Sequence, residues 1–231
     1  MKLFEKELKE LLSANGADLI GFSCVKTSLP QELSKYPYAI TIVRRLSRAV
    51  TDTIQGAPSM MYFQHYRITN TKLDLLALDA VSFIEKKGYL ALPIAASQST
   101  PDEKEEYKGL FPHKTGAVMS GLGFIGKSGV LITNKYGSFV RLATILTDMP
   151  LEPTGEIQTS KCGACNICRD ACPAHAITGE EYIPGHPRKE IFDAKKCSEH
   201  MKTYKHIGRG AVCGICMSVC PFNKKRIPVE E

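Results

Sequence analysis

The spacing of apolar residues predicts two helices in the N-terminal part of the chain. Apolar side chains recur every three or four positions before Gly16, a residue type that commonly ends helices. Over residues 71–88 the same spacing gives one continuous apolar face, which ends at Gly88. The positions that carry these patterns are Phe4, Leu8, Leu11 and Leu12 in the first helix and Leu73, Leu76, Ala80, Val81 and Ile84 in the second.

Runs rich in β-branched and apolar residues predict strands between and after these helices. The predicted strands are ADLIGFS (17–23), YAITIVR (38–44), YLALPIA (89–95), VLIT (130–133) and SFVRLATILT (138–147). The last two flank the turn NKYG and are expected to form a hairpin, whereas residues 99–109 read as a polar loop or short surface helix.

These elements predict an α+β domain over residues 1–155. The stretch MPLEPTGEIQ contains Pro and Gly and is typical of a linker. Residues 156–231 then form a second, small and loop-rich domain that contains most of the cysteines. Because this segment has few apolar residues, its folding must depend on something other than a hydrophobic core.

Composition adds an expected location. No run of about 18 apolar residues is present, and the charged N-terminus MKLFEKELKELLSANG lacks the apolar core of a signal peptide. We therefore expect a cytoplasmic protein that does not enter the membrane. The net charge of +6 is explained by a solvated basic surface, with an anionic partner as the alternative.

The cysteines indicate a metal-containing protein. Of the nine cysteines, all but Cys24 fall between Cys162 and Cys220. Disulfides are rare in the cytoplasm, so a dense cluster of cysteines there favours metal ligation. Cys24 follows an apparent strand and is expected to be a buried small residue.

The cysteine spacing predicts two [4Fe–4S] clusters. CGACNICRDACP follows the bacterial ferredoxin pattern C-x2-C-x2-C-x3-C-P, and CGICMSVCP repeats its ending. In that pattern three cysteines of a tight loop bind one cluster, and the cysteine before proline binds the other. The alternative, a pair of structural zinc sites, is less specific to this spacing. The expected ligand sets are Cys162, Cys165, Cys168 and Cys220 for one cluster and Cys172, Cys197, Cys213 and Cys216 for the other.

The stretch SGLGFIGKSG matches the dinucleotide-binding pattern G-x-G-x-x-G through Gly121, Gly123 and Gly126. That function requires a strand before the glycines and a helix after them, but a predicted strand follows. The glycines instead allow a close backbone approach, either to a flat group or within a tight turn.

A family resemblance rests on this stretch together with the cysteine motifs. GLGFIGKSGVLITNKYGSFVRLATILTDMPLEP followed by CGACNICRDACP resembles the epoxyqueuosine reductase family, which is related to reductive dehalogenases. The resemblance is close over residues 111–221 and looser over residues 1–110. It implies a nitroreductase-like N-terminal domain that binds cobalamin and a ferredoxin-like domain with two [4Fe–4S] clusters.

The resemblance also implies roles for individual residues. The loop with Gly121, Gly123 and Gly126 would lie against the corrin ring, and Lys127 could contact an anionic group such as a corrin phosphate. In YFQHYR, His65 and Tyr66 are candidates for cofactor binding or proton supply. A flavin, or no cofactor at all, remains the alternative for this domain.

The sequence departs from the family at the proton donor. The family's V-D-S-x-P stretch is absent, and the region reads ALPIAASQSTPDEKEEYKGLFPHK. Tyr107, His113 and Lys114 are the candidate catalytic residues near that position. The family's helical repeats, which help hold tRNA, are also absent, so a small molecule or modified nucleoside is the expected substrate and tRNA is less expected.

The cysteine motifs and the family resemblance leave two candidate functions for this protein. In the first, the protein is a reductase whose clusters receive electrons from an external ferredoxin or flavodoxin and pass them to cobalamin. In the second, it is a ferredoxin-like electron-transfer protein that serves a separate partner without catalysis of its own. The length of the α+β domain favours the reductase, because an electron carrier needs only the cluster domain.

Overall fold

The computed structural model describes residues 2–97, 107–208 and 212–224. Its centre is a four-stranded antiparallel sheet in the order β1-β2-β6-β3. The strands are β1 (Leu19–Cys24), β2 (Tyr38–Arg45), β3 (Ala91–Ile94) and β6 (Val140–Thr147). An α+β architecture is thereby confirmed.

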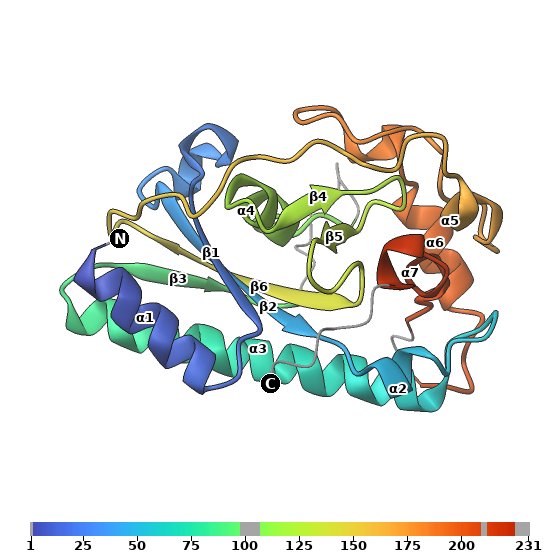
Figure 1. The fold of residues 1–231 in the computed structure, drawn as a ribbon, viewed down its shortest axis with the longest axis horizontal. Coiled ribbons are helices and arrows are strands. Elements are labelled where there is room, and N and C mark those ends of the chain that lie inside the picture. Colours follow the sequence, from blue (N-terminus) through green and yellow to red (C-terminus); the bar gives the residue numbers. More distant parts are fainter. Residues whose placement is uncertain (1, 98–106, 209–211, 225–231) are drawn as a thin grey trace.

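Helices cover both faces of this sheet (Figure 1). One face packs against α1 (Leu3–Ala14) and the long α3 (Met60–Lys86), and the other packs against α4 (His113–Met119). Successive side chains of a strand point to opposite faces of the sheet. In β2, Ile40 and Ile42 pack in the core under α1 and α3, whereas Val43 packs in the core under α4. A short α2 (Arg48–Thr51) precedes α3.

A second, two-stranded sheet lies beside α4. It pairs β4 (Gly123–Ile125) with β5 (Leu131–Thr133), so the predicted hairpin between residues 130–133 and 138–147 is wrong. Only Thr133 and Gly137 bridge across the NKYG turn. β6 then leaves β5 and enters the large sheet, because its apolar side chains are buried against layers on both sides.

Two helical regions differ from the sequence prediction. α3 begins at Met60 and not near residue 71, because the Ser59 hydroxyl accepts a hydrogen bond from the Tyr62 amide and caps the helix. The first turns of α3 were missed since polar residues interrupt their apolar pattern. α4 was also missed, because it is short and follows Pro112. The predicted polar segment 99–109 lies largely outside the described residues.

The C-terminal part consists of short helices joined by loops. These helices are α5 (Ile167–Asp170), α6 (Ala194–Met201) and α7 (Ile215–Ser218), and the same part contains 3-10 turns at Arg188–Glu190 and Pro221–Lys224. Two further 3-10 turns, Lys26–Ser28 and Gln31–Leu33, lie between β1 and β2. No helix in the described ranges is long and apolar enough to cross a membrane.

The segment predicted as a linker is attached to the α+β domain. The Thr154 amide donates to the Phe22 carbonyl at 3.0 Å, and Leu151 is buried in the main core. The prediction for Cys24 is also wrong, because this last residue of β1 is exposed.

Candidate functional site

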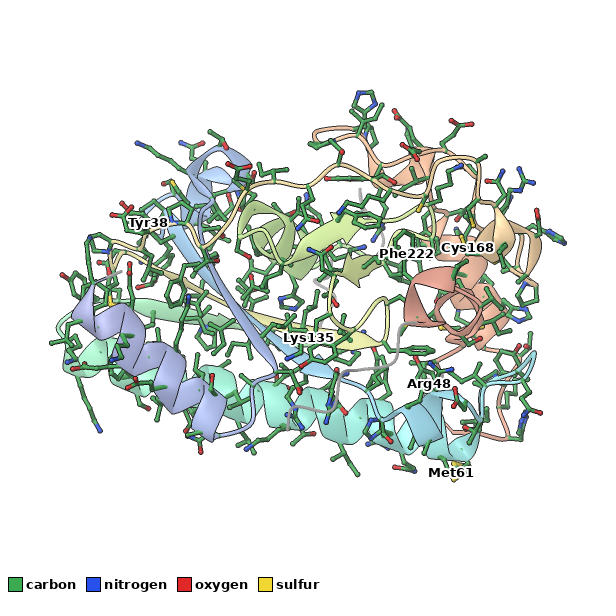
Figure 2. The ribbon with its side chains drawn as sticks, in the orientation of Figure 1. Tyr38, Arg48, Met61, Lys135, Cys168 and Phe222 are labelled. Atoms are coloured by element: carbon green, nitrogen blue, oxygen red, sulfur yellow. The ribbon has the colours of Figure 1, made fainter. Side chains whose placement is uncertain are left out.

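Four thiols from two separate segments line one cavity near α5 and α7. Figure 2 shows Cys168 and Phe222 on this side of the molecule. The cavity also has apolar walls, formed by Ile132, Pro221 and Phe222, which limit the access of water. Its thiols belong to Cys162, Cys165, Cys168 and Cys220.

The remaining four thiols form a second group. Burial, followed by the neighbouring thiols of Cys213 and Cys172, raises the pKa of Cys197 to about 11. Burial also raises the pKa of Cys216, with further contributions from Cys213 and Cys197. Electrostatic interactions thus connect Cys172, Cys197, Cys213 and Cys216, and Cys216 also interacts with Cys168 of the first group.

The two groups suit clusters better than single ions. In the part of the chain that the structure describes, no three His, Cys, Asp or Glu side chains are arranged to hold one metal ion. All nine cysteines are free of disulfides. The Ala176 amide donates to the Cys172 sulfur at 3.5 Å, a contact that would stabilise a thiolate. Because ligands must be thiolates, cluster binding would release protons from these buried thiols.

The glycine motif packs against the chain itself. A Cβ on Gly121, whose φ is +74°, would lie 2.8 Å from the Gly155 Cα, and one on Gly123 would lie 2.2 Å from the Ile132 carbonyl oxygen. Gly126 faces Ile132 and the Cys162 sulfur, at 2.6 and 3.3 Å from its Cβ position. The glycines therefore allow a close backbone approach to β5, the 150–156 segment and the cysteine cavity, and a contact of this loop with a corrin ring stays a prediction.

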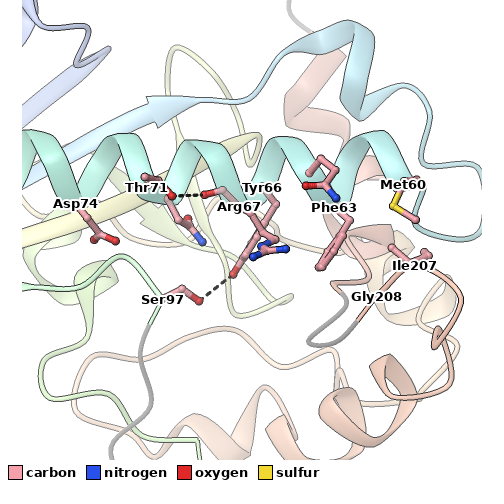
Figure 3. A pocket seen from close by; sticks show the side chains of 11 residues that line it. Met60, Phe63, Tyr66, Arg67, Thr71, Asp74, Ser97, Ile207 and Gly208 are labelled. Carbon is pink, nitrogen blue, oxygen red and sulfur yellow. Dashed lines mark hydrogen bonds between the residues drawn. The ribbon is translucent and has the colours of Figure 1, made fainter.

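An open groove of about 710 Å³ follows the N-terminal half of α3 (Figure 3). The Tyr66 hydroxyl lies 3.3 Å from the Ser97 hydroxyl and closes one side. Aromatic, amide and charged side chains share its wall, so the groove can hold a group with both apolar and polar surface. It is lined by Met60, Phe63, Gln64, Tyr66, Arg67, Asn70, Thr71, Asp74, Ser97, Ile207 and Gly208.

A continuous side-chain contact joins this groove to the second thiol group. Tyr62 is buried, and Tyr66, Cys213 and Cys216 pack around the same small core. The rings of Tyr62 and Tyr66 meet edge to face at 6.4 Å. The groove wall and the second thiol group are thus separated by aromatic side chains and not by solvent.

Arg141 fixes the groove wall from the sheet side. Its guanidinium lies 4.1 Å from the centre of the Tyr66 ring, and its Nε donates to the Asn70 Oδ1 at 2.9 Å. A second donor reaches the Ala96 carbonyl at 3.3 Å. The sequence analysis missed Arg141, although a single charge within the apolar run SFVRLATILT was a usable signal.

His113 is held in one neutral tautomer. Its Nε2 lies 3.0 Å from the Ala95 carbonyl, which can only accept, so Nε2 carries the proton. Its Nδ1 then accepts from the Thr144 hydroxyl at 3.0 Å. Burial lowers the pKa of His113 to about 4, and the charges of Arg141 and Lys114 add to this effect. His113 is therefore unsuited to donate a proton near neutral pH.

The other predicted site residues make hydrogen bonds outside the groove. The Lys114 ammonium donates to the Gly129 carbonyl, and burial together with Arg188 and Arg141 lowers its pKa to about 8. Tyr107 has a φ of +63°, and its carbonyl accepts from Arg188. The His65 Nε2 accepts from the Ser47 amide at 2.9 Å, outside the groove lining.

The comparisons with known proteins agree with this arrangement. Residues 161–223 match the family described as "4Fe-4S double cluster binding domain". The chain is 31% identical over 163 residues to an epoxyqueuosine reductase from Staphylococcus aureus, with 69% of this chain and 39% of that protein covered. It is 29% identical over 189 residues to a tetrachloroethene reductive dehalogenase from Sulfurospirillum multivorans, with 78% of this chain and 35% of that protein covered.

The fold is also that of a solved reductive dehalogenase. That structure, described as suggesting a mechanism for B12-dependent dehalogenation, superposes with a TM-score of 0.72 at 19% identity. The match covers 94% of this chain and 31% of the other. The chain thus spans between about a third and two fifths of the length of these relatives. Its similarity to epoxyqueuosine reductases and reductive dehalogenases includes both the α+β domain and the cysteine segments.

Proposed function

We propose that this chain is an iron–sulfur reductase in which two [4Fe–4S] clusters deliver electrons to a cobalamin held by a nitroreductase-like N-terminal domain. One observation carries the proposal: the second thiol group and the groove on α3 share the small core of Tyr62 and Tyr66. This packing supports the proposal, because electrons would cross only a short stretch of protein between a cluster bound by these thiols and a group held in the groove.

The ligand assignment follows the two thiol groups. One cluster takes the four cysteines that line the cavity, and the other takes the four that are coupled through Cys216. An external donor of low potential, of the ferredoxin or flavodoxin type, would reduce them. The sets are Cys162, Cys165, Cys168 and Cys220, and Cys172, Cys197, Cys213 and Cys216.

The groove fits part of a corrinoid. Phe63 and Tyr66 offer apolar surface to a flat ring, while Arg67, Asn70 and Thr71 offer partners for its amide and phosphate groups. When bound, cobalamin would supply a cobalt centre reduced by the nearer cluster. Arg141, stacked on Tyr66 and bonded to Asn70, would keep this wall in place and add positive charge behind it.

The substrate class follows from the names of the relatives, an epoxide reductase and a chloroalkene dehalogenase. Both reactions cleave a bond between carbon and an electronegative atom with two electrons and at least one proton. Of the three candidate donors, Lys114 has a pKa of about 8, in the range suited to proton transfer near neutrality. We therefore propose Lys114 rather than His113 as the proton source on pKa alone, since neither side chain is among the residues that line the groove.

Anaerobic reconstitution with iron, sulfide and cobalamin tests this function. We expect about eight irons and eight sulfides per chain, and a corrinoid spectrum that persists through gel filtration. Asn70→Leu should weaken corrinoid retention and leave the iron content unchanged, whereas Lys161→Gln, at an exposed residue, should change neither.

Each contrary result has its own meaning. About four irons, or stoichiometric zinc, would overturn the cluster assignment. Two intact clusters without retained corrinoid would instead support the electron-transfer function, in which the clusters serve a separate partner. Reduction of an epoxide or an organohalide by the reconstituted protein, with titanium(III) citrate as the electron source, would then identify the substrate class.

A further inference from the structure

Lys127 is a buried cation on the wall of the first thiol cavity. Only 7% of its surface is exposed, and it lines the cavity together with Cys162, Cys165 and Cys168. Its ammonium donates to the Asn166 Oδ1 at 3.3 Å, and no carboxylate among the described residues pairs with it. Burial of an unpaired lysine is unfavourable, so the cavity should hold an anionic partner.

The turn between β4 and β5 places this lysine. The Gly129 amide donates to the Gly126 carbonyl at 2.8 Å, and the Gly126 amide donates to the Val130 carbonyl at 3.0 Å. Because Gly126 has no side chain, the turn can lie against the Cys162 sulfur. Asn166, which holds the ammonium, lies between Cys165 and Cys168 at the start of α5.

Resting on the cluster assignment above, we propose that Lys127 is the countercharge of the cluster bound by Cys162, Cys165, Cys168 and Cys220 and raises its reduction potential. A [4Fe–4S] cluster with four thiolates is anionic, and it becomes more negative by one charge when it accepts one electron. A fixed cation beside it therefore stabilises the reduced form more than the oxidised form. The apolar walls of Ile132 and Phe222 keep water from screening this charge.

Lys161 provides a matched control. It precedes Cys162 directly but is exposed, and its ammonium donates to the Gln158 Oε1 at 3.2 Å. Water screens the charge of an exposed lysine, so its effect on the same cluster should be small. Comparison of the two lysines separates a buried charge from mere proximity in the sequence.

The test is a redox titration of the full, anaerobically reconstituted chain, with dithionite as the electron source and EPR as the readout. At the potential where the first cluster of the wild type is half reduced, Lys127→Gln should decrease the ratio of reduced to oxidised cluster at least tenfold. For a one-electron couple this corresponds to a shift of about 59 mV to lower potential. Lys127→Arg and Lys161→Gln should stay within about twofold of the wild type, and the second cluster should not respond.

Iron content separates failure of this inference from failure of the function. Unchanged potentials in a Lys127→Gln protein with about eight irons would overturn the countercharge and leave the two clusters in place. Loss of the first cluster from Lys127→Gln but not from Lys127→Arg would support it, because arginine keeps the positive charge and glutamine does not. Loss from both variants would refute it by showing a packing role, whereas a wild type without two clusters would reject the function itself.

Discussion

Cys220 lies on the wall of the same cavity as Cys162, although the two residues belong to different cysteine segments. Cys220 lies two residues after the end of α7, and the 3-10 turn after it brings Phe222 to the cavity as well. The first and second cysteine segments therefore contribute thiols to the same cavity.

Alanine variants of Cys162 and Cys172 should damage different clusters. Cys162 lines the first cavity, whereas Cys172 is coupled to Cys197 and Cys213 in the second group. We expect each variant to retain about half of the iron and to lose a different EPR signal. If the two variants lost the same signal, each segment would build its own cluster and the crossed assignment would be incorrect.

Gly126→Ala should lower the thermal midpoint mainly through its contact with Ile132, which is closer than its contact with the Cys162 sulfur. The new methyl group would lie 2.6 Å from the Ile132 Cδ1, and overpacking of this kind costs about 1–3 kcal/mol. Ile132→Val removes that carbon, so the double variant should be more stable than Gly126→Ala alone. A double variant whose loss equals the sum of the two single losses would show that the contact is not the cause.

The stability of the protein should fall below pH 6.5 because of His113. An unfolded histidine binds a proton near pH 6.5, but the folded chain does so only near its pKa of about 4. Between these values the unfolded state binds more protons, so this contribution is complete above pH 6.5 and is lost as the pH falls toward 4. The expected loss from pH 6.5 to 5 is about 1–2 kcal/mol.

His113→Gln isolates that contribution. Thermal midpoints of the wild type and of this variant should be measured at pH 7.5 and pH 5.5. Acid sensitivity of the clusters affects both proteins, so only the difference between them reports on residue 113. The difference should shrink at the lower pH, and parallel decreases would show that His113 titrates normally.

Asn223 should stabilise the contact between the 3-10 turn Pro221–Lys224, which follows the last cysteine, and the residues that lead into β6. Its Oδ1 accepts from the Ser138 amide at 2.8 Å and from the Ser138 hydroxyl at 3.1 Å, and its Nδ2 donates to the Met217 carbonyl at 2.5 Å. Asn223→Ala leaves the buried Ser138 amide without its partner, while the Ser138 hydroxyl still bonds the Met217 carbonyl, and should cost about 1–3 kcal/mol. It should also speed the release of iron to a chelator.

Ser138→Ala is the comparison: it leaves the amide bond to Asn223 intact but removes the hydroxyl that bonds the Met217 carbonyl and the Cys220 thiol. Its expected cost is about 1 kcal/mol. Equal iron-release rates for the two variants would show that Asn223 does not hold the C-terminal cysteine segment to the residues that lead into β6.

The sequence predicted the elements that carry a regular apolar pattern. β2 and β6 were identifiable because most of their side chains are buried in continuous runs, and the C-terminal part of α3 because one face is apolar. The start of α3 was not identifiable, since its polar residues line the groove and interrupt the pattern. The pairing of β5 with β4 depends on the tertiary packing of α4, which the local sequence does not encode.

The candidate site was predictable where chemistry fixes the spacing. The cysteine motifs alone predicted two groups of four, and the ligand sets remain a prediction. The burial of Lys127 and the stacking of Arg141 on Tyr66 were not predictable, because each depends on residues distant in the sequence. The neutrality of His113 likewise requires Ala95 and Thr144 to be in place.

The attachment of the 148–156 segment to β1 has a kinetic consequence. Electron tunnelling slows steeply with distance, so a cluster unit on a flexible tether would transfer electrons only when it swung toward its acceptor. Here the Thr154 amide is bonded to Phe22, and Gly155 packs against Gly121. With the distance fixed in this way, internal electron transfer should not wait for a motion of the cluster-binding segment, and its rate should be the same in water and in viscous glycerol solutions.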